Sequence, residues 1–381
     1  MPPTQPIATP AQASRLVVGL VAGSFAFCLI GSSIVDTIRP GSATLGYLVI
    51  TLVLFALVLR FRIKLDSRLV NELLLLGVGA IIGLLAFWEY FEHYVIYGAA
   101  LLATLFLAME TRLGPQVINQ TVKYCVFLAT TLAVYETLTQ EYLFVLSTEL
   151  MELDEKLFSG RNEIFRAKGP FYGPLTLGKF YLLAAILLRQ SPRWVLICGA
   201  GALLTQSRTA GLLITCLYLL DNGPAQRLSL LIRALLGAGV VSVLVYFFGV
   251  SGERMVAGTD LEETGNAARI FFWQISWDYF SDYNLGEMIF GNSGAWTLAS
   301  GGLPTESAVI YTLLDGGLLL LSLIFLPLLG AMRRRDFLLS GVLIIAASNV
   351  NLFYFGRMSS LFFFFLVWRT LLHTDKAPSF S

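Results

Sequence analysis

Long apolar runs recur along the whole chain and constrain its fold more than any other feature. A helix needs about 20 mainly apolar residues to cross the hydrocarbon core of a bilayer. On that basis the runs predict about twelve membrane-spanning helices, several of them short. They lie over 16–35, 43–59, 69–87, 94–109, 117–138, 174–188, 194–206, 209–220, 228–250, 307–331, 337–351 and 358–372.

The composition agrees with this pattern, since 56% of the residues are hydrophobic and 13% are charged. Soluble domains run at about 45–50% apolar and about 25% charged. A soluble enzyme, a nucleic-acid-binding protein and a disordered chain are therefore excluded. The four cysteines lie inside apolar runs, so we expect small buried side chains and no disulfide. The sequence predicts an all-α polytopic integral membrane protein with one membrane domain over 16–372.

The basic residues of the short loops fall on one side of the predicted bundle. Because cytoplasmic loops are enriched in Lys and Arg, that side is expected to be the cytoplasm. Both ends share it, a disordered segment over 1–15 and a tail over 373–381. Two long segments, 139–173 and 251–305, then face outward. Long loops in compact proteins are often functional, so we expect the chemistry on the outer face.

The first candidate site is a turn over 161–174 that glycine and proline residues punctuate. It presents Arg161, Arg166 and Lys168, and it also contains Tyr172. Such a basic cluster suits a phosphate or pyrophosphate group. The alternative is a basic belt against anionic lipid headgroups.

The second candidate is Arg208, which interrupts the apolar stretch 194–220. The stretch is too long for one ordinary span, so we expect a tight out-and-back turn near the outer surface. An ionisable residue at that depth indicates a functional site, unless its side chain snorkels to the interface. Arg357, in the last outer turn, is a further candidate phosphate contact.

The third candidate lies in the large outer segment. Ile270, Trp273, Trp277 and Phe280 recur at helical spacing, which predicts an amphipathic helix on the outer leaflet. Arg269 is expected at its N-terminal end, where the helix dipole would support an anion site. The aromatic residues suit packing and interface anchoring, with a sugar platform as the alternative.

The fourth candidate is Glu306, at the start of the span over 307–331. A carboxylate there could take a proton from an acceptor hydroxyl. The alternative is a capping residue in the first turn of the helix. Motifs for nucleotides, metals or serine nucleophiles are absent from the sequence, so no cofactor and no metal ion are expected.

These motifs follow one another in an order that resembles a known superfamily. They are a basic Gly-Pro-Phe turn at Arg166–Pro174, Ser-Arg-Thr-Ala at Ser207–Ala210, an amphipathic segment ending at Phe290–Asn292, and Glu306 followed by Gly316–Gly317. On a scaffold of about twelve spans, this order is similar to the O-antigen polymerase and O-antigen ligase superfamily. The likeness covers roughly residues 100–330.

The resemblance implies a GT-C-like glycosyltransferase of the bacterial inner membrane that acts on the periplasmic face. The donor would be a glycan on undecaprenyl pyrophosphate, and the acceptor another lipid-linked repeat unit. The family's arginines match Arg166, Arg208 and Arg269, which would stabilise the pyrophosphate leaving group without a metal ion. Contacts to pyrophosphate or glycan are assigned to Arg161, Arg166, Lys168, Tyr172, Trp273 and Arg357.

One departure from the family bears on the choice of reaction. Ligases of this superfamily carry a histidine where the span after the large loop begins, and here Glu306 lies near that place. This favours a polymerase of O-antigen, exopolysaccharide or capsule. A chain-length regulator is one partner that such a polymerase could have. A ligase or oligosaccharyltransferase on the same scaffold, and a flippase or transporter of lipid-linked glycans, are the alternatives.

Overall fold

The computed structural model describes eleven stretches of the chain, and all structural statements below concern these residues. They are 15–38, 43–61, 67–87, 92–109, 114–144, 165–171, 173–222, 265–292, 307–334, 337–349 and 358–372.

All regular secondary structure in these stretches is helical. The N-terminal half contains a run in which α1 (Arg15–Ala26), a π-helical turn η2 (Phe27–Gly31) and α2 (Ser32–Ile38) follow without interruption. It continues with α3 (Ala43–Phe61), α4 (Ser67–Phe87), α5 (Glu92–Met109) and α6 (Gly114–Thr139).

The second half begins with three short helices, α8 (Pro174–Leu187), α9 (Pro192–Leu204) and α10 (Arg208–Asn222). Then come α12 (Gly265–Ser281), α13 (Leu285–Phe290), α15 (Ala308–Arg334), α16 (Phe337–Asn349) and α17 (Met358–Leu372). Each predicted span therefore coincides with a helix, apart from 228–250, which lies outside the described residues.

Within the described residues, three helical segments are long and apolar enough to cross a membrane, over Val18–Val35, Gln116–Thr139 and Ala308–Gly330. Several shorter apolar helices accompany them, among them α8, α9 and α10. At 1.5 Å per residue, a 13-residue helix such as α9 is about 20 Å long, less than the roughly 30 Å of a bilayer core. The α9–α10 hairpin thus has the tight reversal that the sequence predicts, on helices shorter than a full span.

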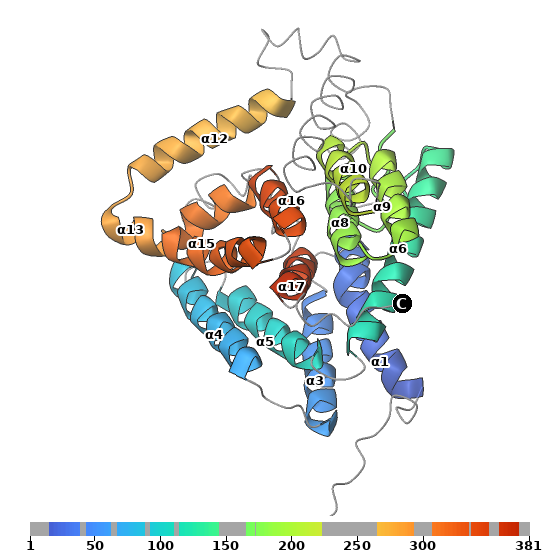
Figure 1. The fold of residues 1–381 in the computed structure, drawn as a ribbon, viewed down its shortest axis with the longest axis horizontal. Helices are drawn as coiled ribbons and strands as arrows, with labels where there is room; N and C mark the ends of the chain where they lie inside the picture. The colour runs from blue at the N-terminus through green and yellow to red at the C-terminus, as the bar shows by residue number, and fades with distance from the viewer. Residues whose placement is uncertain are drawn as a thin grey trace, which may run out of the picture.

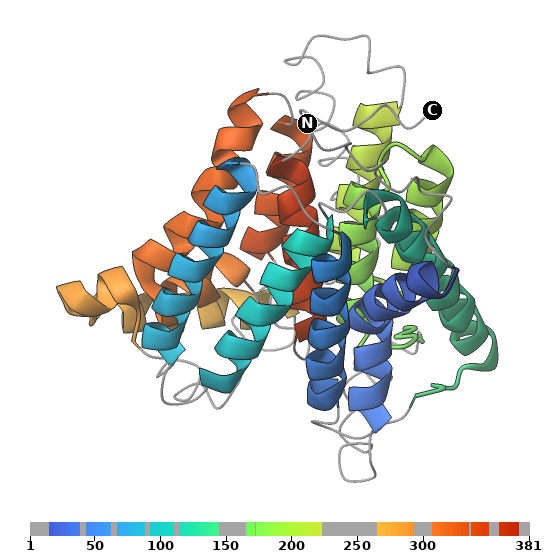
Figure 2. The same cartoon turned by 90° about the horizontal axis from the view of Figure 1, so that it is seen from below.

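The helices pack around α17, which contacts η2, α5, α8 and α15 (Figure 1). Figure 2 shows α4, α5 and α15 standing upright, with α12 and α13 running crosswise in the lower half of the view. The C-terminal end of α4, next to a predicted outer loop, lies in the same half. The four cysteines are buried and unpaired, as expected from their apolar neighbours.

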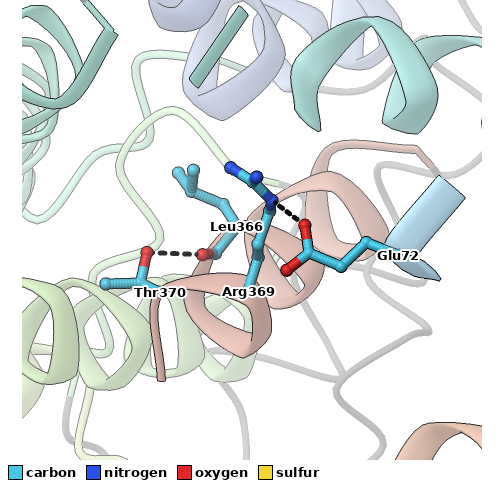
Figure 3. A network of polar contacts seen from close by, with 4 residues as sticks. All are labelled: Glu72, Leu366, Arg369 and Thr370. Atoms are coloured by element: carbon cyan, nitrogen blue, oxygen red, sulfur yellow. Dashed lines mark hydrogen bonds and ion pairs between the residues drawn. The ribbon is translucent and has the colours of Figure 1, made fainter. Parts of the chain in front are cut away.

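A buried ion pair joins α4 to α17 (Figure 3). Arg369 Nε donates to Glu72 Oε2 at 2.8 Å, and the two side chains are 2% and 9% exposed. The guanidinium also lies over the ring of Phe106, 5.1 Å from its centroid. One cation thus ties together α4, α5 and α17.

Helix α15 is interrupted twice. Gly317 has non-helical dihedral angles, φ 68° and ψ −177°, so the helix breaks there. Pro327 lies further along, where it removes a backbone N–H donor. Trp368 Nε1 donates to the carbonyl of Ile324 at 2.8 Å in this weakened stretch, so α17 supplies a bond next to the proline.

Candidate functional site

The segment before α8 forms a turn, residues 165–171 and 173, which we call the basic turn. Gly173 caps α8 in an extended conformation, and Pro174 takes the first helical position, which suits its fixed φ. Phe171 N donates to Lys168 O at 3.2 Å, and Gly169 has a φ of 53°, which glycine adopts without strain. In Figure 2 the basic turn lies in the same half of the molecule as α12 and α13.

The carboxylate of Glu136, on α6, binds the backbone of the basic turn. The residue is 0% exposed, and its Oε2 accepts from Lys168 N at 2.9 Å and from Gly169 N at 2.7 Å. Its Oε1 accepts from Leu143 N at 3.3 Å. Hydrogen bonds to a charged acceptor are the strong kind, so one carboxylate fixes two segments on the end of α6.

Sequence reasoning missed Glu136. The available signal was an acidic residue close to the end of an otherwise apolar run, and such residues are functional candidates by default.

Lys168 lies inside the turn and is only 1% exposed. Its Nζ is 4.8 Å from the centroid of the Tyr142 ring, and its charge also acts on Glu136. Tyr142 in turn donates from its hydroxyl to Arg166 O at 3.1 Å. The structure therefore gives Lys168 partners within the protein, and its predicted contact with a ligand stays a prediction.

Arg166 brings the basic turn together with the α9–α10 turn. Its Nε donates to Thr205 O at 3.2 Å, and Ala167 N donates to Leu204 O at 3.2 Å. Gln206, with a φ of 54°, reaches back from its Nε2 to Phe165 O at 3.4 Å. The first two motifs singled out in the sequence are thus in direct contact.

The α9–α10 turn is itself closely packed. Thr205 Oγ1 accepts from Ser207 N at 3.1 Å and donates to Ala202 O at 2.8 Å. A Cβ atom placed on Gly178 of α8 would lie 2.5 Å from Ser207 Cβ, so glycine is needed for this approach. Arg208 is the first residue of α10, directly after this turn, and its side chain lies outside the described residues.

Helix α12 confirms the predicted helix in the large outer segment but begins earlier than expected. It begins at Gly265, so Arg269 lies a turn inside the helix and the prediction that it stands at the N-terminal end is wrong. Trp273 and Phe280 are half-buried, whereas Trp277 is 66% exposed. Within the described part of the chain, the buried Nε1 of Trp273 has no hydrogen-bond partner.

Helix α15 begins at Ala308, and Ser307 precedes it as the capping residue. Ser307 Oγ accepts from Ile310 N at 3.3 Å, which is an N-cap bond. Glu306 itself lies outside the described residues, so its interpretations as a proton acceptor and as a capping residue both stay predictions.

The remaining candidates are not placed by the structure. Arg161, Tyr172, Glu306 and Arg357 lie outside the described residues, as does the side chain of Arg269. Among the residues that are described, no three His, Cys, Asp or Glu side chains come close enough to hold a metal ion. The metal-independent reaction stays a prediction.

The chain matches none of the known protein families in sequence, and no curated protein matches it either.

The site can hold an anion by its chemistry. A guanidinium has five N–H donors in a planar fork that matches phosphate oxygens, and the bond from Arg166 to Thr205 fixes its place. Helix α10 begins at this turn, and the N-terminus of a helix carries partial positive charge. The bonds from Lys168 N and Gly169 N to Glu136 hold the backbone of the basic turn on the end of α6, next to Arg166.

Proposed function

We propose that this protein is a membrane glycosyltransferase that polymerises a lipid-linked glycan, such as O-antigen, exopolysaccharide or capsule. It spans the bacterial inner membrane with about twelve helices and acts on the periplasmic face. Donor and acceptor are both oligosaccharides on undecaprenyl pyrophosphate.

The observation that carries the proposal is the contact between the basic turn and the α9–α10 turn. Arg166 and Arg208 belong to segments far apart in the sequence, yet Arg166 Nε bonds the carbonyl three residues before Arg208. Two arginines that were each expected to bind pyrophosphate thus belong to one backbone-linked unit. An arginine pair is suited to a diphosphate, which carries charge on both phosphates.

The proposed reaction needs these cations in the transition state. Breaking the anomeric C–O bond leaves negative charge on the pyrophosphate, and the acceptor hydroxyl loses its proton as it attacks the same carbon. Guanidinium groups that are already oriented stabilise the developing charge. Glu306 is proposed to receive the proton of the acceptor hydroxyl.

The test is reconstitution of purified protein in nanodiscs with a lipid-linked repeat unit as the only substrate. A ladder of products on a gel supports a polymerase. Transfer that occurs only after lipid A–core is added identifies a ligase and overturns the polymerase proposal. Activity is expected to persist in the presence of a chelator, and loss that only a divalent ion restores would contradict the metal-free mechanism.

Arginine variants connect the reaction to the site. Arg208→Ala or Arg269→Ala should lower polymer formation by about 100-fold or more, as removal of one charge-stabilising donor commonly does. Arg193→Ala is the matched control, because Arg193 is an exposed arginine at the opposite end of α9. Normal chain lengths in both variants would refute the pyrophosphate site.

A further inference from the structure

The end of α13 packs against the break in α15, backbone on backbone. Gly291 follows α13 with a φ of 81°, and Gly317 in the break has a φ of 68°. A Cβ atom on Gly291 would overlap the carbonyl of Asp315. A Cβ atom on Gly317 would overlap the carbonyl of Ile289 and lie 2.5 Å from Gly291 N. Only glycine fits on either side, for reasons of both space and backbone conformation.

Tyr283 adds a polar bond between the same elements. Its hydroxyl donates to the carbonyl of Leu314 at 2.9 Å, in the turn before the break. Burial, and secondly the charge of Asp315, raise the pKa of Tyr283 far above its usual value, so the hydroxyl keeps its proton. A carbonyl near a helix break inside a membrane protein needs such a donor, because lipid supplies none.

This contact holds the crosswise helices to the rest of the molecule. Tyr283 and Leu314 form a small apolar cluster, separate from the main core, against which Tyr279, Phe280, Met288 and Ile310 pack. Helix α12 packs on α15, and α13 packs on α15 and α4. Within the described residues, α12 and α13 are joined to α15 through a small area centred on Tyr283, Gly291 and Gly317, which we call the glycine joint.

We propose that the glycine joint positions α12 for catalysis by locking it to the outer half of α15. Arg269 and Trp273 lie on α12, and Glu306 directly precedes the cap of α15. The joint would therefore fix the distance between the groups that bind the leaving pyrophosphate and the group that receives the acceptor proton. Its catalytic consequence rests on the function proposed above, whereas the locking itself does not. Tyr283, Gly291 and Gly317 are positioning residues, since they act through α12.

Distance measurement between spin labels tests the joint directly. The labels are placed by Asp278→Cys on α12 and Leu326→Cys on α15, two exposed positions, while the four native cysteines are buried. We expect one narrow distance distribution in the otherwise native chain. Gly291→Ala and Gly317→Ala should broaden or shift it.

A matched control is Gly330→Ala, because Gly330 is also in α15 and nothing lies within 4 Å of the place that an added Cβ atom would take. This variant should leave the distribution unchanged. A second label pair, at Leu196 of α9 and Leu326 of α15, shows whether the bundle itself is intact. If a glycine variant fails to fold, Tyr283→Phe replaces it as the test variant, because this change removes only the hydroxyl.

The kinetic expectation separates positioning from general damage. With the second label pair unchanged, Gly317→Ala should lower kcat by about 100-fold, the order that follows from a misplacement of about 1 Å, with KM for the repeat unit nearly constant. Unchanged α12–α15 distances in all three variants would overturn the joint while leaving the polymerase proposal standing. If the variants broaden the distances but the native chain itself makes no polymer from the repeat unit, the joint is supported and the proposed function is refuted.

Discussion

At the scale of single residues, the buried charged groups Glu136, Glu72 and Arg369 are hydrogen-bonded within the protein. Glu136 illustrates the principle, since a carboxylate in an apolar helix is costly unless it is hydrogen-bonded. Its three backbone donors come from two segments that the chain must bring to the end of α6. Its contribution therefore depends on tertiary contacts that spacing along α6 does not reveal.

Replacing Glu136 by glutamine should destabilise the protein and displace the basic turn. The amide keeps one acceptor oxygen but presents an NH₂ group to a backbone N–H, so a buried donor loses its partner. The expected loss is about 1–3 kcal/mol in the free energy of unfolding. Titration with a denaturing detergent measures it.

The control is Glu141→Gln, which alters an exposed carboxylate at the same end of α6 and should change stability by less than about 0.5 kcal/mol. Equal losses in the free energy of unfolding would show that the hydrogen bonds of Glu136 contribute no more to stability than an exposed carboxylate does.

A second prediction concerns Glu72 and Arg369. A variant in which both residues are replaced should be more stable than the variant in which only Glu72 is replaced. Glu72→Leu leaves a buried guanidinium without its carboxylate and should cost about 3–5 kcal/mol. Adding Arg369→Met should recover most of that loss, because two apolar side chains can fill the same space. A double-mutant cycle of unfolding free energies gives the coupling.

Asn71→Ala is the matched control for this pair, as Asn71 is the exposed neighbour of Glu72 on α4. If the double variant were as unstable as Glu72→Leu, the loss would come from packing against Phe106 rather than from the unpaired charge.

At the scale of elements, the apolar runs predicted the helices that lie within them, but they did not predict the turns. Spans such as 43–59 and 358–372 match α3 and α17 closely, because an apolar run long enough for a helix has few other solutions in a membrane. Helix α13 was missed although Asn284 and Glu287 form a capping box that the sequence displays. The break at Gly317 depends on the backbone of Gly291, a contact that no local pattern encodes.

The two turns of the candidate site could be predicted from the sequence, but the contact between them could not. The basic turn and the Arg208 turn both stood out as polar interruptions of apolar sequence. Their contact arises because α8 and α9 are short and α10 returns beside them, which places Thr205 next to Arg166. Glu136, which holds the turn, shows no motif of its own.

The packing of α8 against the α9–α10 turn yields a third prediction. Gly178→Ala should destabilise the protein by about 1–3 kcal/mol, since the new methyl group would lie 2.5 Å from Ser207 Cβ and 3.1 Å from Thr205 Oγ1. The same shift would displace Thr205 from Arg166, so polymer formation should fall as well. Thermal unfolding and the product ladder measure the two effects.

Gly199→Ala in α9 provides the comparison, because its added methyl group would meet Ile214 Cγ2 at an ordinary 3.6 Å. Alanine also favours the helix by up to about 1 kcal/mol, so this variant should be neutral or stabilising. A stable Gly178→Ala protein would mean that the turn can move away from α8 without loss.

At the scale of the whole molecule, several of the elements that carry candidate residues lie in one half. The basic turn, α12, α13 and the C-terminal end of α4 share the lower half of Figure 2. The loop between α8 and α9 belongs to the end that the arginine distribution assigns to the cytoplasm. A glycan chain bound for the cell surface needs its polymerising site on the outer side, so orientation is a condition of the proposed function.

The orientation can be measured with two cysteine variants and an impermeant maleimide applied to intact spheroplasts. Ser281→Cys, at the exposed end of α12, should be labelled directly, whereas Gln190→Cys, in the exposed turn between α8 and α9, should be labelled only after lysis. The native thiols give little background because all four are buried. The reverse pattern would place the basic turn and α12 on the cytoplasmic side. In that case the polymerase proposal would fail even if the arginines bound pyrophosphate.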